Sequence, residues 1–120
     1  MEFFGTVSVA QCDITALQKQ LTIAALPNFC SAIDNVMSAE QNDGEIYCLW
    51  GAFRVRRESI RQGVRFSLLD CPHALAWTIT CKAEDQLRVH CTIDDYEVDE
   101  EFAESIRQFV ADWETGLAGI

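Results

Sequence analysis

The sequence lacks the residue patterns on which most enzymes and metalloproteins depend. It contains only two histidines, and none of its six cysteines stands in a Cys-x-x-Cys pair. It has no glycine-rich phosphate loop and no serine in a nucleophile-elbow context. These absences exclude the common zinc, thioredoxin-type, nucleotide-binding and serine-hydrolase motifs, and we expect neither a metal nor a cofactor.

Long apolar runs and basic residues are also scarce. No segment approaches the ~18 consecutive apolar residues that a membrane span needs, and residues 1–4 do not resemble the start of a signal peptide. Nine Lys and Arg stand against 19 Asp and Glu, and the resulting net charge of −10 opposes binding to nucleic acid. We therefore expect a cytoplasmic protein that binds neither membranes nor nucleic acid.

The cysteines are expected to be reduced and structural. The chain has 120 residues, 49% of them hydrophobic, which is enough for one domain over residues 1–120 with a core that needs no disulfide. Free cysteine commonly behaves as a small buried apolar residue. We extend this interpretation to all six: Cys12, Cys30, Cys48, Cys71, Cys81 and Cys91.

Alternation of apolar and polar residues predicts an antiparallel hairpin in the second half of the chain. Apolar residues occupy every second position over residues 75–82 and again over residues 87–94. One register, with Cys81 opposite Leu87, keeps the apolar residues of both strands on the same face. That face is expected to be the core side of a sheet.

Two more strands are expected before this hairpin. Residues 60–68 alternate in the same way. Residues 45–57 are interpreted as a single strand with Val55 facing the core and Ile46 facing away from it, unless Gly51 forms a bulge that changes this facing.

The N-terminal third is expected to contain a strand and two helices. Residues 3–9 alternate and add a strand to the sheet, and Asp13 is a suitable N-cap for a helix over residues 14–24. Pro27 suits the first turn of a second helix that continues over residues 29–37. The two helices can also be one helix that is kinked at the proline.

A long amphipathic helix is expected at the C-terminus. Asp99 is its predicted N-cap, and apolar residues recur at helical spacing from Phe102 to Leu117. The order is thus strand, two helices, four strands and a long helix. It predicts an α+β fold: an antiparallel sheet with helices packed on one face and the long C-terminal helix across it.

This order of elements resembles that of helix-grip domains, although the predicted sheet is two strands shorter. The resemblance implies an apolar ligand held between a curved sheet and the last helix. The residues available to line such a pocket are Phe66, Trp77, Phe109 and Trp113. The last strand and helix are also similar to those of small acidic bacterial secretion chaperones.

Basic residues of the predicted sheet fall on the face away from the core. A register with Val55 opposite Ile60 would place Arg54 opposite Arg61 and Trp50 beside Arg65. This face is a candidate surface for an acidic protein partner or for a second copy of the chain, and a solvated sheet face is the alternative. Its residues are Trp50, Arg54, Arg56, Arg61, Arg65, Arg88 and His90.

Catalytic chemistry has few candidates. Cys71 and His73 stand two residues apart in an expected turn, which is an unspecific signal for an activated thiol. His90 and Cys91 point to opposite faces of their strand. The sequence therefore favours a small acidic binding module that forms a homodimer over an apolar-ligand-binding domain and over an enzyme with a dispersed site.

Overall fold

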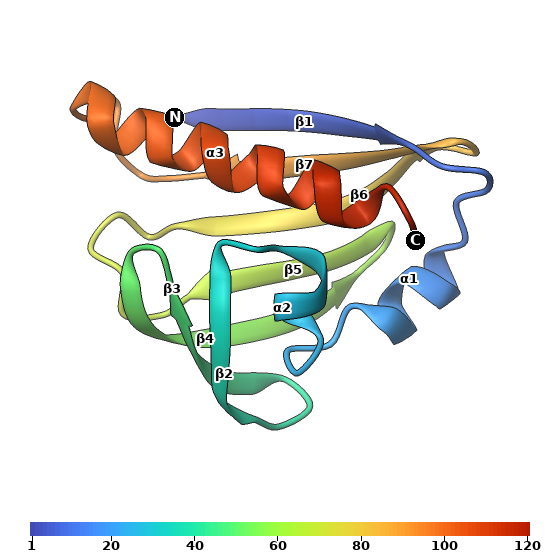
Figure 1. Ribbon diagram of the computed structural model, residues 1–120, viewed down its shortest axis with the longest axis horizontal. Coiled ribbons are helices and arrows are strands. Elements are labelled where there is room, and N and C mark those ends of the chain that lie inside the picture. Colours follow the sequence, from blue (N-terminus) through green and yellow to red (C-terminus); the bar gives the residue numbers. More distant parts are fainter.

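The computed structural model describes all 120 residues. It contains one seven-stranded sheet in which every neighbouring pair is antiparallel, in the order β1-β7-β6-β5-β4-β3-β2. The predicted fold class is confirmed (Figure 1). The elements are β1 (Glu2–Ser8), α1 (Ile14–Gln20), α2 (Leu26–Phe29), β2 (Ile33–Ala39), β3 (Asp43–Cys48), β4 (Gly51–Ile60), β5 (Gly63–Leu68), β6 (Ala76–Ala83), β7 (Gln86–Thr92) and α3 (Glu100–Leu117).

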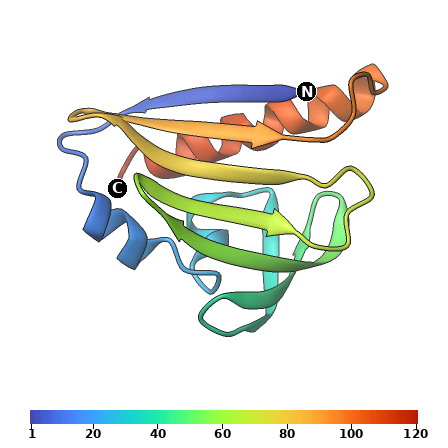
Figure 2. The same cartoon turned by 180° about the vertical axis from the view of Figure 1, so that it is seen from behind.

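The C-terminal helix α3 lies across one face of the sheet, over β1 and β7 (Figure 1). Its N-cap is Asp99, as predicted, because a carboxylate oxygen of Asp99 accepts a hydrogen bond of 2.8 Å from the Phe102 N–H. The apolar side of the helix is buried in a core cluster of 25 residues. Figure 2 shows that α3 leaves the opposite face of the sheet uncovered. None of the helices combines the length and the apolar character needed to cross a membrane.

The hairpin of β6 and β7 has the predicted register, with Cys81 opposite Leu87 and Trp77 opposite Cys91. β1 joins the sheet, as expected, and it lies beside β7. The outer edge of β1 is partly covered by α3, because the Thr6 N–H donates to a carboxylate oxygen of Glu114 at 3.1 Å.

The helix predicted over residues 29–37 is wrong. α2 covers only Leu26–Phe29, and the rest of the segment forms the edge strand β2. The pairing of β2 with β3 is irregular after Ile33 and again after Val36. The first irregularity, between Ile33 and Asn35, places the inward-facing Ile33 and Val36 three positions apart, which imitates the period of a helix.

The single strand predicted over residues 45–57 is also wrong, because the segment contains a tight hairpin. Cys48 pairs with Gly51, and the two residues between them form the turn from β3 to β4. Gly51 has a φ of 118°, a backbone conformation that favours glycine. The turn reverses the predicted facing, so that Ile46 is fully buried. With β2 and this extra strand, the sheet regains the two strands by which the prediction fell short of helix-grip domains.

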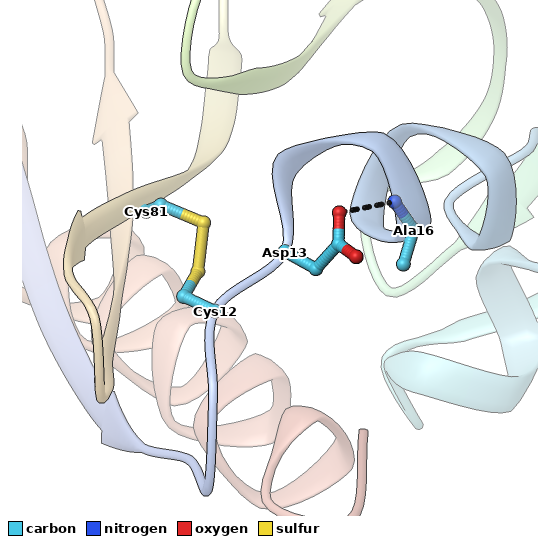
Figure 3. Close-up of a disulfide and its surroundings, with 4 residues drawn as sticks. All are labelled: Cys12, Asp13, Ala16 and Cys81. Carbon is cyan, nitrogen blue, oxygen red and sulfur yellow. Dashed lines mark hydrogen bonds between the residues drawn. A yellow bond between two sulfur atoms is a disulfide. The ribbon is translucent and has the colours of Figure 1, made fainter.

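The prediction that all cysteines are reduced is wrong as well. Cys12 and Cys81 form a disulfide between the β1–α1 connection and the end of β6 (Figure 3). After β1 ends, the chain continues beside the β6–β7 turn, where the Cys12 N–H donates to the Glu84 carbonyl at 2.6 Å. That contact brings the two sulfur atoms together. Asp13 then caps α1, as predicted, by accepting from the Ala16 N–H at 3.1 Å (Figure 3).

A buried arginine, which the sequence did not single out, attaches the end of α1 to the sheet. Arg57 is only 8% exposed. Its guanidinium donates to the carbonyls of Leu21 (2.6 Å) and Gln18 at the C-terminal end of α1. These carbonyls have no partner within the helix, and a cation is favourable at that end of the helix dipole. Desolvation by burial lowers the pKa of Arg57 from its ordinary value.

Candidate functional site

An apolar pocket of about 230 Å³ lies between the N-terminal half of α3 and two connections of the sheet. The connections are the β3–β4 turn and the segment that joins β5 to β6. Six of the eight lining residues are hydrophobic. The lining consists of Trp50, Phe53, Leu68, Cys71, Pro72, His73, Leu75 and Phe102.

One wall of the pocket is an indole ring fixed by hydrogen bonding and stacking. The Trp50 N–H donates to the Ser105 hydroxyl at 3.0 Å, and that hydroxyl donates to the Phe102 carbonyl at 2.6 Å. The ring centroid of Trp50 lies 5.0 Å from that of Phe109 and 6.1 Å from that of Phe102. The prediction that Trp50 lies on the outer sheet face is therefore wrong, because the β3–β4 turn directs it toward α3.

The polar side of the pocket is a histidine held by an aspartate. His73 Nδ1 lies 2.9 Å from a carboxylate oxygen of Asp95, and both side chains are about one-third exposed. The imidazole also packs against Phe102, with ring centroids 4.4 Å apart. The His73 carbonyl accepts from the Asp94 N–H at 2.9 Å, so that both backbone and side chain are fixed.

Sequence reasoning missed this histidine–aspartate pair, although a signal for it was present. The register of β6 and β7 pairs residues whose numbers sum to a constant, as in Cys81 with Leu87. Extended past the ends of both strands, that register places His73 opposite Asp95. The pair was overlooked because each residue was considered with its neighbours in the chain.

Cys71 is the only one of the four free cysteines that is not buried, and it lines the same pocket. Burial raises the pKa of Cys48, and it raises the pKa of Cys30 and of Cys91 to about 12. The turn after His73 contains Ala74 with a φ of 50°, which is uncommon for a residue other than glycine. No group of three His, Cys, Asp or Glu side chains is placed to hold a metal ion.

The four aromatic residues expected to line a cavity are packed against one another in the core. Each of them is at most 1% exposed. The ring centroids of Phe66 and Trp77 are 5.4 Å apart, and those of Trp77 and Phe109 are 5.0 Å apart. The indole N–H groups of Trp77 and Trp113 have no hydrogen-bond acceptor among the protein atoms. Phe109 connects this cluster to the pocket, because it contacts both Trp50 and Trp77.

The outer sheet face differs from the prediction in its register and therefore in its charge. Val55 pairs with Leu68, not with Ile60, so the predicted neighbours Arg54 and Arg61 are not paired. Instead, each of three exposed arginines faces an acidic residue on the next strand. These pairs are Glu45 with Arg54, Asp43 with Arg56 and Glu58 with Arg65.

An exposed phenylalanine lies on this face near the edge of the sheet. Phe4 is 57% exposed and stacks on His90, with ring centroids 4.4 Å apart and an interplanar angle of 5°. The guanidinium of Arg88 lies 5.7 Å from the centre of the Phe4 ring. His90 Nε2 lies 2.9 Å from a carboxylate oxygen of Glu2. Arg88 and His90 thus lie near each other on the outer face, as predicted. Arg61 is separate from them, in the β4–β5 turn.

Comparison with known proteins gives a fold but no sequence relative. No protein-family model and no curated protein matches the sequence. Two solved structures are similar over nearly the whole chain. The protein XoxI from Bacillus cereus has 14% identity and a TM-score of 0.69, and the match covers 98% of this chain and 93% of that chain. A START superfamily protein from Mycobacterium smegmatis has 11% identity and a TM-score of 0.66, with 98% and 94% covered.

The fold of this chain is that of these two proteins. Seven antiparallel strands with a long last helix across them are the architecture that this similarity covers. At 14% and 11% identity the similarity extends to the fold alone.

Proposed function

We propose that the protein binds a small apolar molecule in the pocket beneath the first half of α3. The observation that carries this proposal is the apolar lining around the fixed Trp50 ring. An indole whose N–H is already bonded presents only apolar surface to a ligand. The position of the pocket, between the sheet and the last helix, is also where helix-grip domains hold their ligands.

The size of the pocket limits the ligand. Pockets for drug-sized molecules have volumes of roughly 300–1,000 Å³. The pocket here, at about 230 Å³, is smaller. We therefore propose a compact ligand of one or two rings, or a short branched hydrocarbon, in place of a long-chain lipid.

A titration with naphthalene tests the proposal. We expect saturable changes in proton–nitrogen correlation spectra, centred on residues of the pocket such as Phe53 and Leu75. Cys71→Phe should abolish binding because the added ring fills the pocket. Ala52→Phe adds the same ring at an exposed position on the opposite face, and it should leave binding unchanged. Resonance shifts that do not saturate, or that persist in Cys71→Phe, would contradict the proposal.

Thiol chemistry provides an independent measurement. Because Cys71 is the free cysteine that is not buried, iodoacetamide should modify it before Cys30, Cys48 and Cys91. Saturating naphthalene should slow that modification, since the thiol lines the occupied pocket. If naphthalene leaves the rate of Cys71 modification unchanged, naphthalene binds outside the pocket.

A second candidate function is contact with an acidic protein partner or with a second copy of the chain. The exposed Phe4 beside Arg88 and His90 supports it. Aromatic and arginine side chains are enriched in interface centres. Sedimentation velocity of the wild type and of Phe4→Ser tests the homodimer. A dimer that Phe4→Ser dissociates would support this candidate, and a monomeric wild type would exclude the homodimer.

A further inference from the structure

We infer that the pocket selects a ligand carrying a hydroxyl group, and that His73 Nε2 accepts the hydrogen bond from it. This inference rests on the proposed function and adds to it the polar group of the ligand. Three features of the pocket lead to it: the scarcity of polar side chains, the state of the imidazole and the rigidity of its support.

His73 is the one lining residue with a nitrogen or oxygen atom in its side chain that is free to meet a ligand. The Trp50 N–H is already bonded to Ser105, and the remaining side chains are apolar apart from the weakly polar Cys71 thiol. A single polar position in an apolar pocket fixes the orientation of a ligand and determines which functional group the ligand carries.

The hydrogen bond to Asp95 determines which ring nitrogen of His73 donates and which accepts. An ionised carboxylate only accepts hydrogen bonds, so the 2.9 Å contact requires the proton of the neutral imidazole to lie on Nδ1. In this neutral form Nε2 bears a lone pair and is an acceptor. A hydroxyl group donates to such an acceptor, whereas an ether or a hydrocarbon of the same size does not.

The imidazole is also held in place before a ligand arrives. Phe102 packs on the ring at 4.4 Å, and the Asp94 N–H binds the His73 carbonyl at 2.9 Å. A group that is already ordered loses little conformational entropy on binding. Asp95 is thus a positioning residue, and His73 is the residue that contacts the ligand.

Three probes with the same ring system test the inference: naphthalene, β-naphthol and β-naphthyl methyl ether. A neutral hydrogen bond contributes a net advantage of about two- to tenfold in affinity. We expect β-naphthol to bind more tightly than the other two by this factor. His73→Phe keeps a ring against Phe102 and should remove the advantage of β-naphthol while naphthalene still binds.

A spectroscopic measurement on the wild type does not depend on the folding of a variant. β-Naphthol should shift the nitrogen resonance of His73 Nε2 and leave that of His73 Nδ1 nearly unchanged. His90 lies on the opposite face of the sheet, bonded to Glu2, and is the internal control. Its nitrogen resonances should not respond.

The outcomes separate the two proposals. If naphthalene binds in the pocket and β-naphthol has no advantage, or retains it in His73→Phe, the hydroxyl inference is overturned and the apolar pocket stands. If none of the three probes binds, the proposed function fails and the hydroxyl inference fails with it.

Discussion

Gly116 of α3 lies directly against the backbone of Phe29 in α2. A Cβ atom at position 116 would approach the Phe29 carbonyl oxygen to 1.7 Å, a distance that no pair of unbonded atoms tolerates. Gly116 does not end the helix, because α3 continues through it to Leu117. The glycine is needed for the close approach of two helices.

Gly116→Ala should therefore destabilise the protein, although alanine is the better helix former. Overpacking costs about 1–3 kcal/mol, whereas alanine in a helix gains about 1 kcal/mol over glycine. We expect a net loss of up to roughly 2 kcal/mol in the free energy of unfolding, measured by urea denaturation. Gly119→Ala is the control, because nothing lies within 4 Å of its added Cβ. A stabilised Gly116→Ala variant would show that α2 does not pack there.

Arg57→Met should release the end of α1 from the sheet. It would leave the carbonyls of Leu21 and Gln18 without their donors in a buried position. Buried acceptors without partners cost about 1–3 kcal/mol each, so the loss of both donors should cost about 2–6 kcal/mol on urea denaturation. Arg56→Met is the matched control. Its ion pair with Asp43 is exposed and should contribute at most about 1 kcal/mol.

Reduction of the Cys12–Cys81 disulfide should lower the stability of the fold. The bond closes a loop with a sequence separation of 69 residues. In the chain-entropy model such a loop stabilises the folded state by about 4 kcal/mol. Urea denaturation with and without reductant measures the difference, and the double variant Cys12→Ser/Cys81→Ser should show no such dependence. Disulfides are rare in the cytoplasm, so this bond argues against the predicted cytoplasmic location.

The buried thiols should make stability fall at alkaline pH. Desolvation raises the pKa of Cys30 and of Cys91 from an ordinary 9.0 to about 12. Between these values the unfolded chain loses a proton that the folded chain retains. The stabilisation is therefore complete below pH 9 and is lost as the pH rises toward 12.

The expected slope is at most about 1.4 kcal/mol of unfolding free energy per pH unit for each thiol. Denaturation curves recorded at successive pH values measure it. Cys91→Ala should have a shallower slope than the wild type, because one of the two thiols is then absent. Identical slopes would mean that Cys91 does not carry the effect.

How far the sequence predicts this fold depends on how regular each strand is. The register of β6 and β7 could be predicted to the residue because the pairing from Trp77 to Cys81 is uninterrupted. β2 could not, because the irregularity between Ile33 and Asn35 converts a strand period into a helical one. The β3–β4 turn was missed for a chemical reason. It consists of Leu49 and Trp50, neither of which belongs to the residues typical of turns.

The candidate site was less accessible to prediction, because it depends on contacts between distant residues. The pocket between sheet and helix could be anticipated from the order of elements, but its lining could not. Trp50 enters the lining only through the unforeseen turn, and the core aromatics pack too closely to leave room. Cys12 and Cys81 are 69 positions apart, and the pairing of six cysteines cannot be deduced from sequence alone.

The hydrogen bond from the Thr6 N–H to the Glu114 carboxylate affects whether the protein can aggregate at high concentration. An unprotected edge strand is a template on which further chains add and grow into fibrils. A chain arriving at β1 would have to displace Glu114 from Thr6. Helix α3 also lies close against β1, since a Cβ atom at Gly5 would come within 2.7 Å of Val110 Cγ1. At the opposite edge, the irregular β2 offers a poor ladder. Helix α3, which covers the pocket, is therefore expected also to protect the β1 edge of the sheet against the addition of further chains.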